Sequence, residues 1–381
     1  MDVESLLAKM VSFDTVNGRL SGRTGPEAAL ASYLESLAAG RGFDLTYLPV
    51  ESEANELLIS FERDPRMPWI LFDSHLDTVS VQGMSIDPFE GTISGGRLSG
   101  RGACDTKGSG AAMFIALSRY AEQADGSNNI MLLFSVEEEQ EMSGIRAFAK
   151  KHLPALGRFV KAAIVGEPTG LRPVVAHCGV QRYLITTHGI SVHSSDPSLG
   201  HSAISDMSEL IHHLEIDYIP TLNASHPLTG TAQFSINVIS GGSAPNVIPN
   251  ECQIQIDRRV APGETSDSTI GHLDRDLRAY GVAHPEIVYE FESLLETPPL
   301  DQSFDMEVLA EIGNSLRDRG KSEEPVGVRF ATHAGDLSVA GIPSVVLGPG
   351  NIEQAHTKDE WIDLKELSAA VEIYLQIMAH G

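Results

Sequence analysis

Residues 69–77, WILFDSHLD, begin with large apolar side chains and end in side chains of the kind that bind metals. A short apolar run of this kind is typical of a strand buried on both faces of a parallel sheet. Three other apolar runs lead to such side chains, at Glu137–Glu139, at Glu167 and ahead of His356. Because ligands gather beyond the carboxyl ends of strands in open α/β sheets, we expect these side chains to lie close together.

The chain around these strands alternates strands with helices. Apolar spacing predicts helices over residues 2–12, 26–40 and 108–120, and buried strands over 57–61, 69–72, 130–134, 162–165 and 342–347. This order predicts a mixed α/β fold whose sheet is largely parallel and flanked by helices.

Residues 178–291 follow a different pattern. Strands are predicted over 181–187, 233–239, 251–259 and 286–291, and helices over 202–214 and 265–280. The order β-α-β-β-α-β is that of a ferredoxin-like unit. We therefore expect residues 1–177 and 292–381 to form one domain, with residues 178–291 inserted into it.

The composition argues against several classes of protein. The 381 residues include 27 Lys and Arg and 52 Asp and Glu, which gives a formal net charge of −25. So acidic a chain repels nucleic-acid phosphates and anionic membranes, and we expect neither as a partner. The cysteines, Cys104, Cys178 and Cys252, are odd in number and far apart, which argues against a disulfide framework. The start, Met1–Ser5, lacks the basic and apolar parts of a signal peptide, so we expect a cytoplasmic protein.

The residues at the strand ends form a set that suits metal ions. It consists of the histidines His75 and His356 and of carboxylates at 137–139, at Glu167 and at Asp105, the last in a Gly-rich turn. Taken singly, each has a structural explanation, since three glutamates in a row also suit the start of a helix. Together, two histidines and three or more carboxylates are what two closely spaced divalent ions require. Such mixed ligands favour zinc, with cobalt or manganese as the other choices.

The same motifs resemble a known family. It is the di-zinc amidohydrolase and exopeptidase family of acetylornithine deacetylase, succinyl-diaminopimelate desuccinylase, aminoacylase and glutamate carboxypeptidase. The resemblance rests on segments in family order that cover nearly the whole chain: 74–79 (SHLDTV), 100–108 (GRGACDTKG), 138–139 (EE), 166–169 (GEPT), 193–195 (HSS), 245–249 (PNVIP) and 354–356 (QAH). It implies that the inserted unit is a lid or dimerisation domain.

The resemblance also implies two zinc ions per subunit, held by the residues that match the family's ligands. His75 and Glu167 would hold one ion, Glu139 and His356 the other, and Asp105 would bridge the two.

Two residues beside these ligands carry catalytic roles in the family. Asp77 would orient His75 and fix its tautomer. Glu138 would be the general base, which takes a proton from the attacking water and passes it to the leaving amine.

The inserted unit supplies three further residues by the same resemblance. His193 matches a histidine that reaches the active site of the partner subunit and stabilises the oxyanion, so we expect a homodimer. Asn246 and Arg259 match positions that bind the substrate carboxylate. An ion pair with Asp257 is the alternative for Arg259.

The expected activity is therefore hydrolysis of the amide bond of an N-acyl-L-amino acid, as in acetylornithine deacetylase. A succinyl-diaminopimelate desuccinylase and a dipeptidase or carboxypeptidase of the same family are alternatives. A non-catalytic binding protein would not need the complete ligand set. A two-metal phosphoesterase would need cations at the site, which only Arg101 and Lys107 offer.

This chain departs from the family pattern in two places. Residues 332–336 read THAGD where relatives carry an acid after the threonine, and this loop borders the substrate in relatives. His333 and Asp336 therefore leave the exact substrate open. Residues 189–192 (GISV), ahead of His193, lack the small and basic residues often found there. Neither departure replaces an expected metal ligand.

Overall fold

The computed structural model describes residues 2–51, 54–301 and 307–381. The chain divides into two compact units. Unit 1 spans Met1–Val175, Gln302–Val326 and Thr332–Gly381, and unit 2 spans Ala176–Asp301 and Gly327–Ala331. Unit 2 is longer than the expected 178–291 because strand β14 (Val288–Thr297) continues past residue 291 and β15 (Leu300–Asp301) follows it. The assignment of 178–291 as a lid or dimerisation domain stays a prediction.

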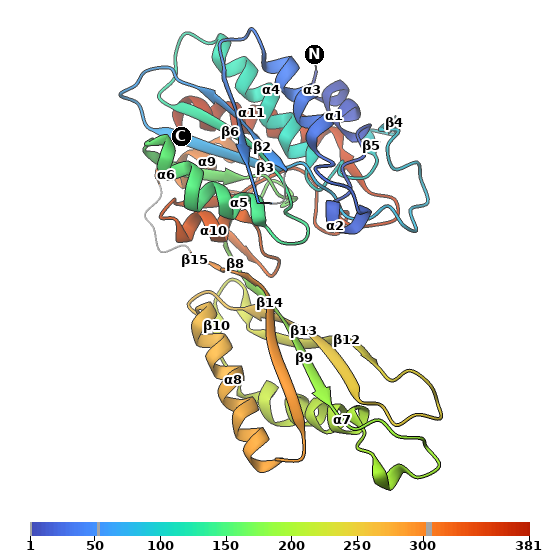
Figure 1. The fold of residues 1–381 in the computed structure, drawn as a ribbon. Helices are drawn as coiled ribbons and strands as arrows, with labels where there is room; N and C mark the ends of the chain where they lie inside the picture. The colour runs from blue at the N-terminus through green and yellow to red at the C-terminus, as the bar shows by residue number, and fades with distance from the viewer. Residues whose placement is uncertain (1, 52–53, 302–306) are drawn as a thin grey trace. The chain divides into compact units, whose positions relative to one another are not determined.

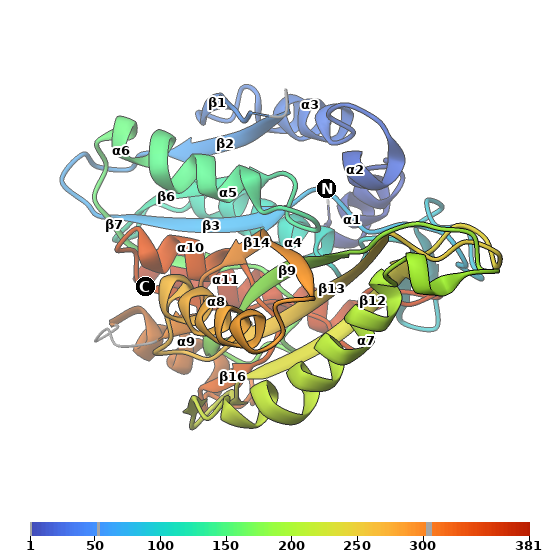
Figure 2. The same cartoon turned by 60° about the horizontal axis from the view of Figure 1, so that its bottom comes forward.

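Unit 1 is built on a mixed sheet with the strand order β1-β2-β6-β3-β7-β17, continued by β8. The strands are β1 (Asp44–Pro49), β2 (Asn55–Phe61), β3 (Trp69–His75), β6 (Asn129–Ser135), β7 (Val160–Val165), β8 (Val174–His177) and β17 (Ser344–Val346). The neighbours β6, β3, β7 and β17 run parallel, whereas β1 and β2 are antiparallel and lie at one edge (Figure 2). Every residue of β3 and β6 is buried, as the continuous apolar runs predict. The predicted mixed, largely parallel sheet is therefore confirmed.

Helices cover both faces of this sheet. Figure 1 shows α1 (Val3–Val11), α3 (Ala28–Ala38) and α4 (Lys107–Glu122) on one side and α5 (Ser143–Ala147) and α10 (His333–Val339) on the other. The C-terminal helix α11 (Leu364–His380) packs against α4. The core between them is formed by residues such as Leu6, Leu7, Met10, Phe72 and Tyr374, all at 0% exposure.

The remaining elements of unit 1 are short, apart from one helix. They are α2 (Gly18–Ser21), α6 (Leu153–Leu156), α9 (Glu307–Arg317) and a small sheet of β4 (Thr92–Ser94), β5 (Arg97–Ser99) and β18 (Trp361–Asp363). In that sheet β18 pairs antiparallel with β5, so segments more than two hundred residues apart in the sequence lie side by side.

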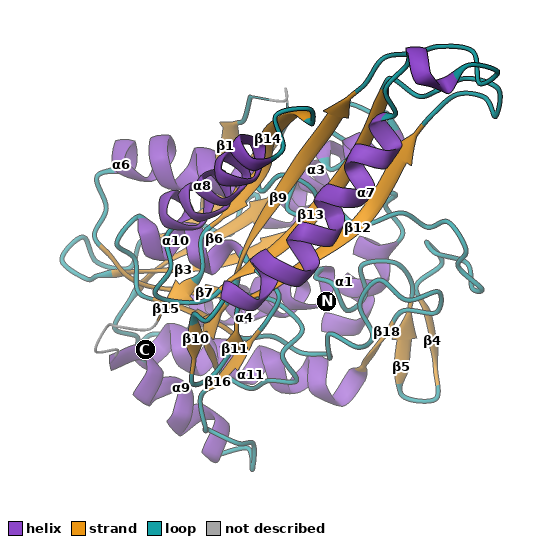
Figure 3. Ribbon diagram, turned by 90° about the horizontal axis from the view of Figure 1, so that it is seen from below, coloured by secondary structure: helices purple, strands orange, loops and turns teal. Residues whose placement is uncertain are grey.

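Unit 2 has the predicted β-α-β-β-α-β order. Its main strands are β9 (Gly179–His188), β12 (Gln233–Gly241), β13 (Glu251–Val260) and β14, and its main helices are α7 (Ala203–His213) and α8 (Ser266–Ala283). The antiparallel sheet has the order β12-β13-β9-β14, and α7 and α8 lie on one of its faces (Figure 3). Cys252, Ile254 and Ile256 of β13 point into the core under these helices, because alternate residues of a strand face the same side.

Two negative findings concern the part of the chain that the structure describes. None of its helices has both the length and the apolar character needed to cross a membrane. Its three cysteines are free, buried thiols.

Candidate metal centre

His75 is the last residue of β3 and has a ring orientation fixed by the main chain. Its side chain is buried, and Nδ1–H donates to the main-chain carbonyl of Asp77 at 2.9 Å. Because a carbonyl only accepts, this bond places the proton on Nδ1 and leaves Nε2 as the metal-binding nitrogen. The carboxylate of Asp77 lies further from Nδ1, at 3.5 Å. The expected orientation of His75 by Asp77 therefore rests chiefly on the main-chain oxygen in this structure.

The Asp77 carboxylate instead anchors the loop that follows β6. It is fully buried and accepts hydrogen bonds from the backbone N–H groups of Glu138 (3.0 Å) and Glu139 (3.1 Å) and from the side chain of Asn17 (2.8 Å). Burial raises the pKa of Asp77, but His75 and these donors outweigh it and lower the pKa below its ordinary value. Asp77 is therefore an ionised anchor that links His75 to Glu138 and Glu139.

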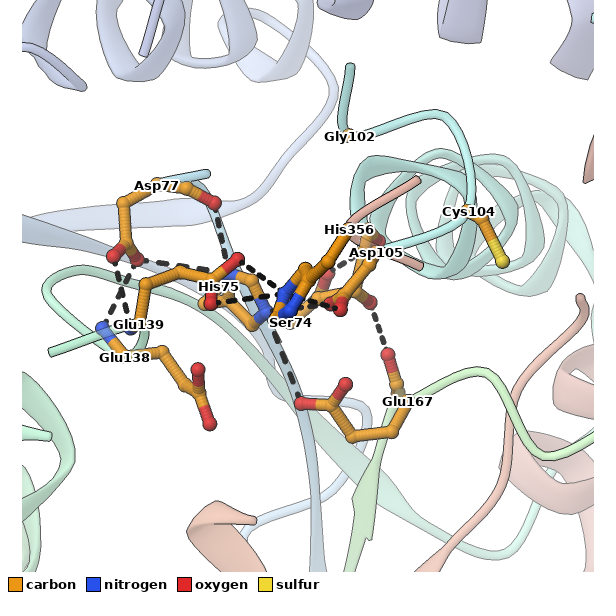
Figure 4. A network of polar contacts seen from close by, with 12 residues as sticks. Ser74, His75, Asp77, Gly102, Cys104, Asp105, Glu138, Glu139, Glu167 and His356 are labelled. Carbon is orange, nitrogen blue, oxygen red and sulfur yellow. Dashed lines mark hydrogen bonds and ion pairs between the residues drawn. The ribbon is translucent and has the colours of Figure 1, made fainter. Parts of the chain in front are cut away.

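Asp105 lies at the centre of the cluster (Figure 4). One carboxylate oxygen is 3.1 Å from Nε2 of His75, and the other is 3.2 Å from Nε2 of His356. A second carboxylate accompanies each imidazole: Glu167 is 3.8 Å from His75, and Glu139 is 3.2 Å from His356. Ligand atoms of His75, Asp105 and Glu139 all lie within 4.8 Å of one another. The structure thus brings together all of the predicted ligands, grouped as the resemblance implies.

The electrostatics of this cluster suit divalent cations. Burial, and then the charges of Asp105 and Glu138, raise the pKa of Glu139 to about 8. Bonds to Asp105 and Glu139 raise the pKa of His356 to about 11. Burial likewise raises the pKa of Glu167 well above its usual range. Carboxylates crowded in a buried site and paired with imidazoles are the donor set that a divalent ion neutralises, so these residues fit the implied zinc ions.

Glu138 lies beside this cluster on the loop anchored by Asp77 (Figure 4). Burial raises the pKa of its carboxyl above the ordinary value. A carboxylate with a raised pKa is a better proton acceptor near neutral pH, as a general base requires.

The two unusual residues after Thr332 form internal ion pairs. Nδ1 of the buried His333 is 2.8 Å from Oδ2 of Asp73, and Asp336 is 3.5 Å from Arg146. Burial lowers the pKa of His333, but Asp73 and then Glu138 outweigh it and raise the pKa above its ordinary value. Asp73 is two residues before His75 on β3, so the pair lies on the same face of the sheet as that ligand. In the sequence, Asp73 is a single acidic residue at the end of an apolar run, and nothing near it indicates a partner 260 positions away.

The residues predicted in unit 2 lie in two places. His193 is exposed, with Nδ1 2.8 Å from the Ser195 hydroxyl, and its strand segment bridges to Val247. The main chain of Asn246 accepts from Ser194, so the segments of His193 and Asn246 are adjacent.

Arg259 lies on β13 and makes the ion pair that was its alternative role. Its Nε is 2.9 Å from the Asp257 carboxylate, and Nη1 donates to the main-chain oxygen of Arg329 at 3.4 Å. Its side chain keeps 33% exposure, so the guanidinium remains partly open.

Comparison with known proteins gives a consistent result. The model of peptidase family M20/M25/M40 matches residues 71–380. The acetylornithine deacetylase of Photorhabdus laumondii is 32% identical over 359 residues, which cover 92% of this chain and 89% of that protein. An M20 family metallo-carboxypeptidase from Sulfolobus solfataricus has the same fold, with a TM-score of 0.83 at 16% identity over 100% of this chain and 99% of its own. A dinuclear metal-binding peptidase of family M20 from Bacillus subtilis has a TM-score of 0.67 at 16% identity, covering 99% and 98% of the two chains.

Proposed function

The chain belongs to peptidase family M20/M25/M40, and on that premise we propose that it is a two-zinc hydrolase that cleaves the amide bond of an N-acyl-L-amino acid. The chain is a hydrolytic enzyme, and its kinship with acetylornithine deacetylases favours a deacylase. The observation that carries the proposal is the position of Asp105 between two imidazoles, each accompanied by a further carboxylate.

Two zinc ions would be held by His75, Asp105, Glu139, Glu167 and His356, with cobalt or manganese compatible with the same donors. When bound, such ions polarise a carbonyl oxygen and lower the pKa of water toward neutrality. The main-chain anchoring of His75 and the Asp77-anchored loop hold the ligands in place before any ion binds.

Glu138 would carry the proton in this reaction. Its loop is fixed by the bond from its N–H to Asp77, and its raised pKa suits a group that accepts a proton and later releases it. It would take the proton of the attacking water and give it to the nitrogen of the leaving amino acid. His193 of the partner subunit would donate to the oxygen that becomes negative during the attack.

Arg259 and Asn246 would bind the free carboxylate of the substrate. Asp257 engages Nε of Arg259, and the only bond from Nη1 in the described residues is the long one to the Arg329 carbonyl. A substrate carboxylate would replace that bond with a stronger, charge-assisted one.

Members of the same family leave two alternatives for the substrate, an N-succinyl amino acid and a short peptide. The metallo-carboxypeptidase with the same fold keeps the second alternative open. The two-metal phosphoesterase has lost its support, because Arg101 binds Glu360 at 2.7 Å and Lys107 donates to the main-chain oxygen of Phe13 at 2.9 Å. Both side chains are buried and bonded to other groups of the protein.

The test is a substrate panel offered to metal-depleted and metal-reconstituted protein. We expect hydrolysis of N-acetyl-L-amino acids that is abolished by a chelator and restored by zinc or cobalt. N-succinyl amino acids, dipeptides and a phosphoester in the same panel separate the alternatives. Full activity in a metal-free preparation would exclude the proposal.

A second arm of the test concerns the free carboxylate. Substrates whose carboxyl group is amidated should be poor, and Arg259→Ala should cost about 2–5 kcal/mol in kcat/KM, as when one partner of a charge pair that substrate binding buries is removed. Arg259→Lys should not restore the rate fully, because the planar fork is lost. Arg182→Ala is the matched control, since Arg182 faces the same Asp257 from the neighbouring strand at 3.6 Å. Equal kcat/KM for free and amidated substrates would remove Arg259 from the site.

A further inference from the structure

Glu360 has a carboxylate that binds the loop carrying Asp105. Its side chain is fully buried, with 0% exposure. Oε1 accepts from the backbone N–H groups of Cys104 (2.9 Å) and Asp105 (3.0 Å), and Oε2 accepts from that of Gly102 (3.1 Å). An ionised carboxylate has enough lone pairs to serve all of these donors at once. The main chain of residues 102–105, including the N–H of Asp105, is therefore held by a residue 255 positions later than Asp105.

The small sheet explains how Glu360 reaches this loop. Strand β18 pairs with β5 so that Trp361 lies opposite Ser99, and the N–H of Gly100 donates to the main-chain oxygen of Glu360 at 3.0 Å. The loop begins directly after β5, and Gly102 within it has a φ of 80°, a conformation that favours glycine. The turn has no helix or strand of its own. Main-chain bonds hold the N–H groups of Arg101 and Ala103, whereas those of Gly102, Cys104 and Asp105 are held by the Glu360 carboxylate.

Arg101 links the same carboxylate to the segment of His356. Its Nη1 donates to Oε2 of Glu360 at 2.7 Å, and its Nη2 donates to the main-chain oxygens of Thr357 at 3.2 Å and Ser80 at 3.0 Å. Thr357 directly follows His356. The Arg101–Glu360 pair thus fastens the loop of one ligand, Asp105, to the segment of another.

We propose that Glu360 is a positioning residue for the metal centre, which holds the main chain of Asp105 against the segment of His356 so that the two oxygens of Asp105 face different imidazoles. This inference rests on the proposed function, because it concerns the divalent ions that those residues would hold. Among the described residues, no hydrogen bond or ion pair joins Glu360 to an imidazole of the cluster. Glu360 acts through Asp105 and, by way of Arg101, through the segment of His356.

The test is Zn²⁺ binding by Glu360→Gln, measured with a competing chromophoric chelator. Glutamine keeps the size, but its amide has one acceptor oxygen and an NH₂ group that would face the N–H donors. We expect the apparent Kd of the weaker-bound ion to rise about 10–100-fold, the usual effect of removing a partner of a metal ligand. The visible absorption of the Co²⁺-loaded protein should change as well, because it reports the geometry of the ligands. Glu372→Gln is the matched control, since it removes an exposed carboxylate that pairs with Arg119 in the same unit.

A second variant separates positioning from charge balance. Glu360→Gln leaves the buried Arg101 unpaired, so its stability is checked by thermal unfolding. The double variant Arg101→Met with Glu360→Gln no longer has the unpaired charge, but it still lacks the carboxylate that accepts the N–H groups of the loop. Weak Zn²⁺ binding in the double variant would support positioning, whereas restored binding would show that Glu360 only balances Arg101 and would overturn the proposal. Glu360→Asp, which keeps the charge on a shorter side chain, should also weaken binding, and serves if the glutamine variants do not fold.

The outcomes distinguish this inference from the proposed function. Wild-type protein that binds no Zn²⁺ would overturn both. Wild-type protein that binds two ions, with equal affinity in a folded Glu360→Gln, would overturn the role of Glu360 alone.

Discussion

At the scale of single residues, the centre depends on carboxylates that serve two partners each. Asp105 faces His75 with one oxygen and His356 with the other, and Asp77 divides its oxygens between the N–H groups of Glu138 and Glu139. A carboxylate is the side chain suited to this task because both of its oxygens accept. Replacing Asp77 by its amide would turn one acceptor into a donor facing an N–H group.

Glu138 and Glu139 are neighbours for which we predict different roles. Glu138→Gln should reduce kcat by at least about 10²-fold, the usual scale for a general base, while the metal content stays near wild type. Glu139→Gln should lose metal, because Glu139 faces His356 at 3.2 Å within the ligand cluster. Activity assays with metal analysis of the purified variants check this. Equal metal loss in both variants would contradict the division of roles.

Metal binding should release protons and strengthen with rising pH. Without an ion, Asp105 and Glu139 hold a proton on His356 by raising its pKa to about 11, and Glu139 has a pKa of about 8. Both residues must be deprotonated to bind a metal, so at pH 7 we expect at least about one proton to be released per chain. The deprotonated fraction of each group grows as pH rises, and so does the apparent affinity.

Calorimetric titration with Zn²⁺ in buffers of different ionisation enthalpy counts these protons. His356→Ala should release fewer of them. Binding enthalpies that do not depend on the buffer would exclude the prediction.

At the scale of elements, α4 lies close to the sheet because its first turns carry glycines. A Cβ at Gly110 would lie 2.9 Å from the Ser74 hydroxyl and 3.0 Å from the ring of Phe134. Ser74 directly precedes His75 on β3, so the distance between α4 and β3 is set beside a metal ligand. At this position, helix propensity favours alanine, whereas close packing against β3 and β6 favours glycine.

We expect substitution by alanine to destabilise the protein at Gly110, where packing is tight, and to stabilise it at Gly271, where helix propensity decides the effect. On α8, a Cβ added at Gly271 would lie near the flexible end of the Arg275 side chain. Gly271→Ala should therefore stabilise the protein by about 0.5–1 kcal/mol. Gly110→Ala gains the same propensity, but overpacking costs about 1–3 kcal/mol, so it should destabilise. Urea unfolding of the two variants gives the comparison. Stabilisation by Gly110→Ala would mean that Ser74 and Phe134 yield without cost.

At the scale of the whole molecule, unit 2 has an open sheet edge. Strand β12 lies at the end of the sheet order and is largely exposed, including Val238 at 48% and Ile239 at 59%. Long exposed edges are normally covered, and a second copy of the chain is the cover that the family resemblance implies. The homodimer stays a prediction, and His193 offers a direct way to examine it.

Two inactive variants should regain activity when mixed, if His193 completes the site of the partner subunit. His193→Ala and Glu138→Gln are each expected to be inactive as homodimers. After dissociation and reassociation, a mixed dimer has one site with both an intact Glu138 and an intact His193. Activity measured before and after subunit exchange tests this, with light scattering to establish the assembly. A fully active monomer would contradict the prediction.

The sequence by itself determined most of the central elements, and it predicted which residues would bind the metal ions. Apolar runs marked β2, β3, β6 and β7, and alternation marked β13, because burial on two faces or on one leaves a local pattern. The predicted ligands other than Asp105 were identified because they come after such runs, and sites form at the ends of parallel strands; Asp105 was identified by its Gly-rich turn. Strand β1 left no such signal, since only Leu48 among its residues is buried.

Only the tertiary structure decided which groups face one another. It showed that the two oxygens of Asp105 face different imidazoles and that Asp73 pairs with His333. It also showed that Arg259 pairs with Asp257. Glu360 shows the reason most clearly. Its partner N–H groups lie 255 to 258 positions earlier in the chain, and β18 must pair with β5 before they meet. A local sequence pattern shows which face of a helix or strand is buried. Contacts of this kind form only when distant segments of the chain pack together.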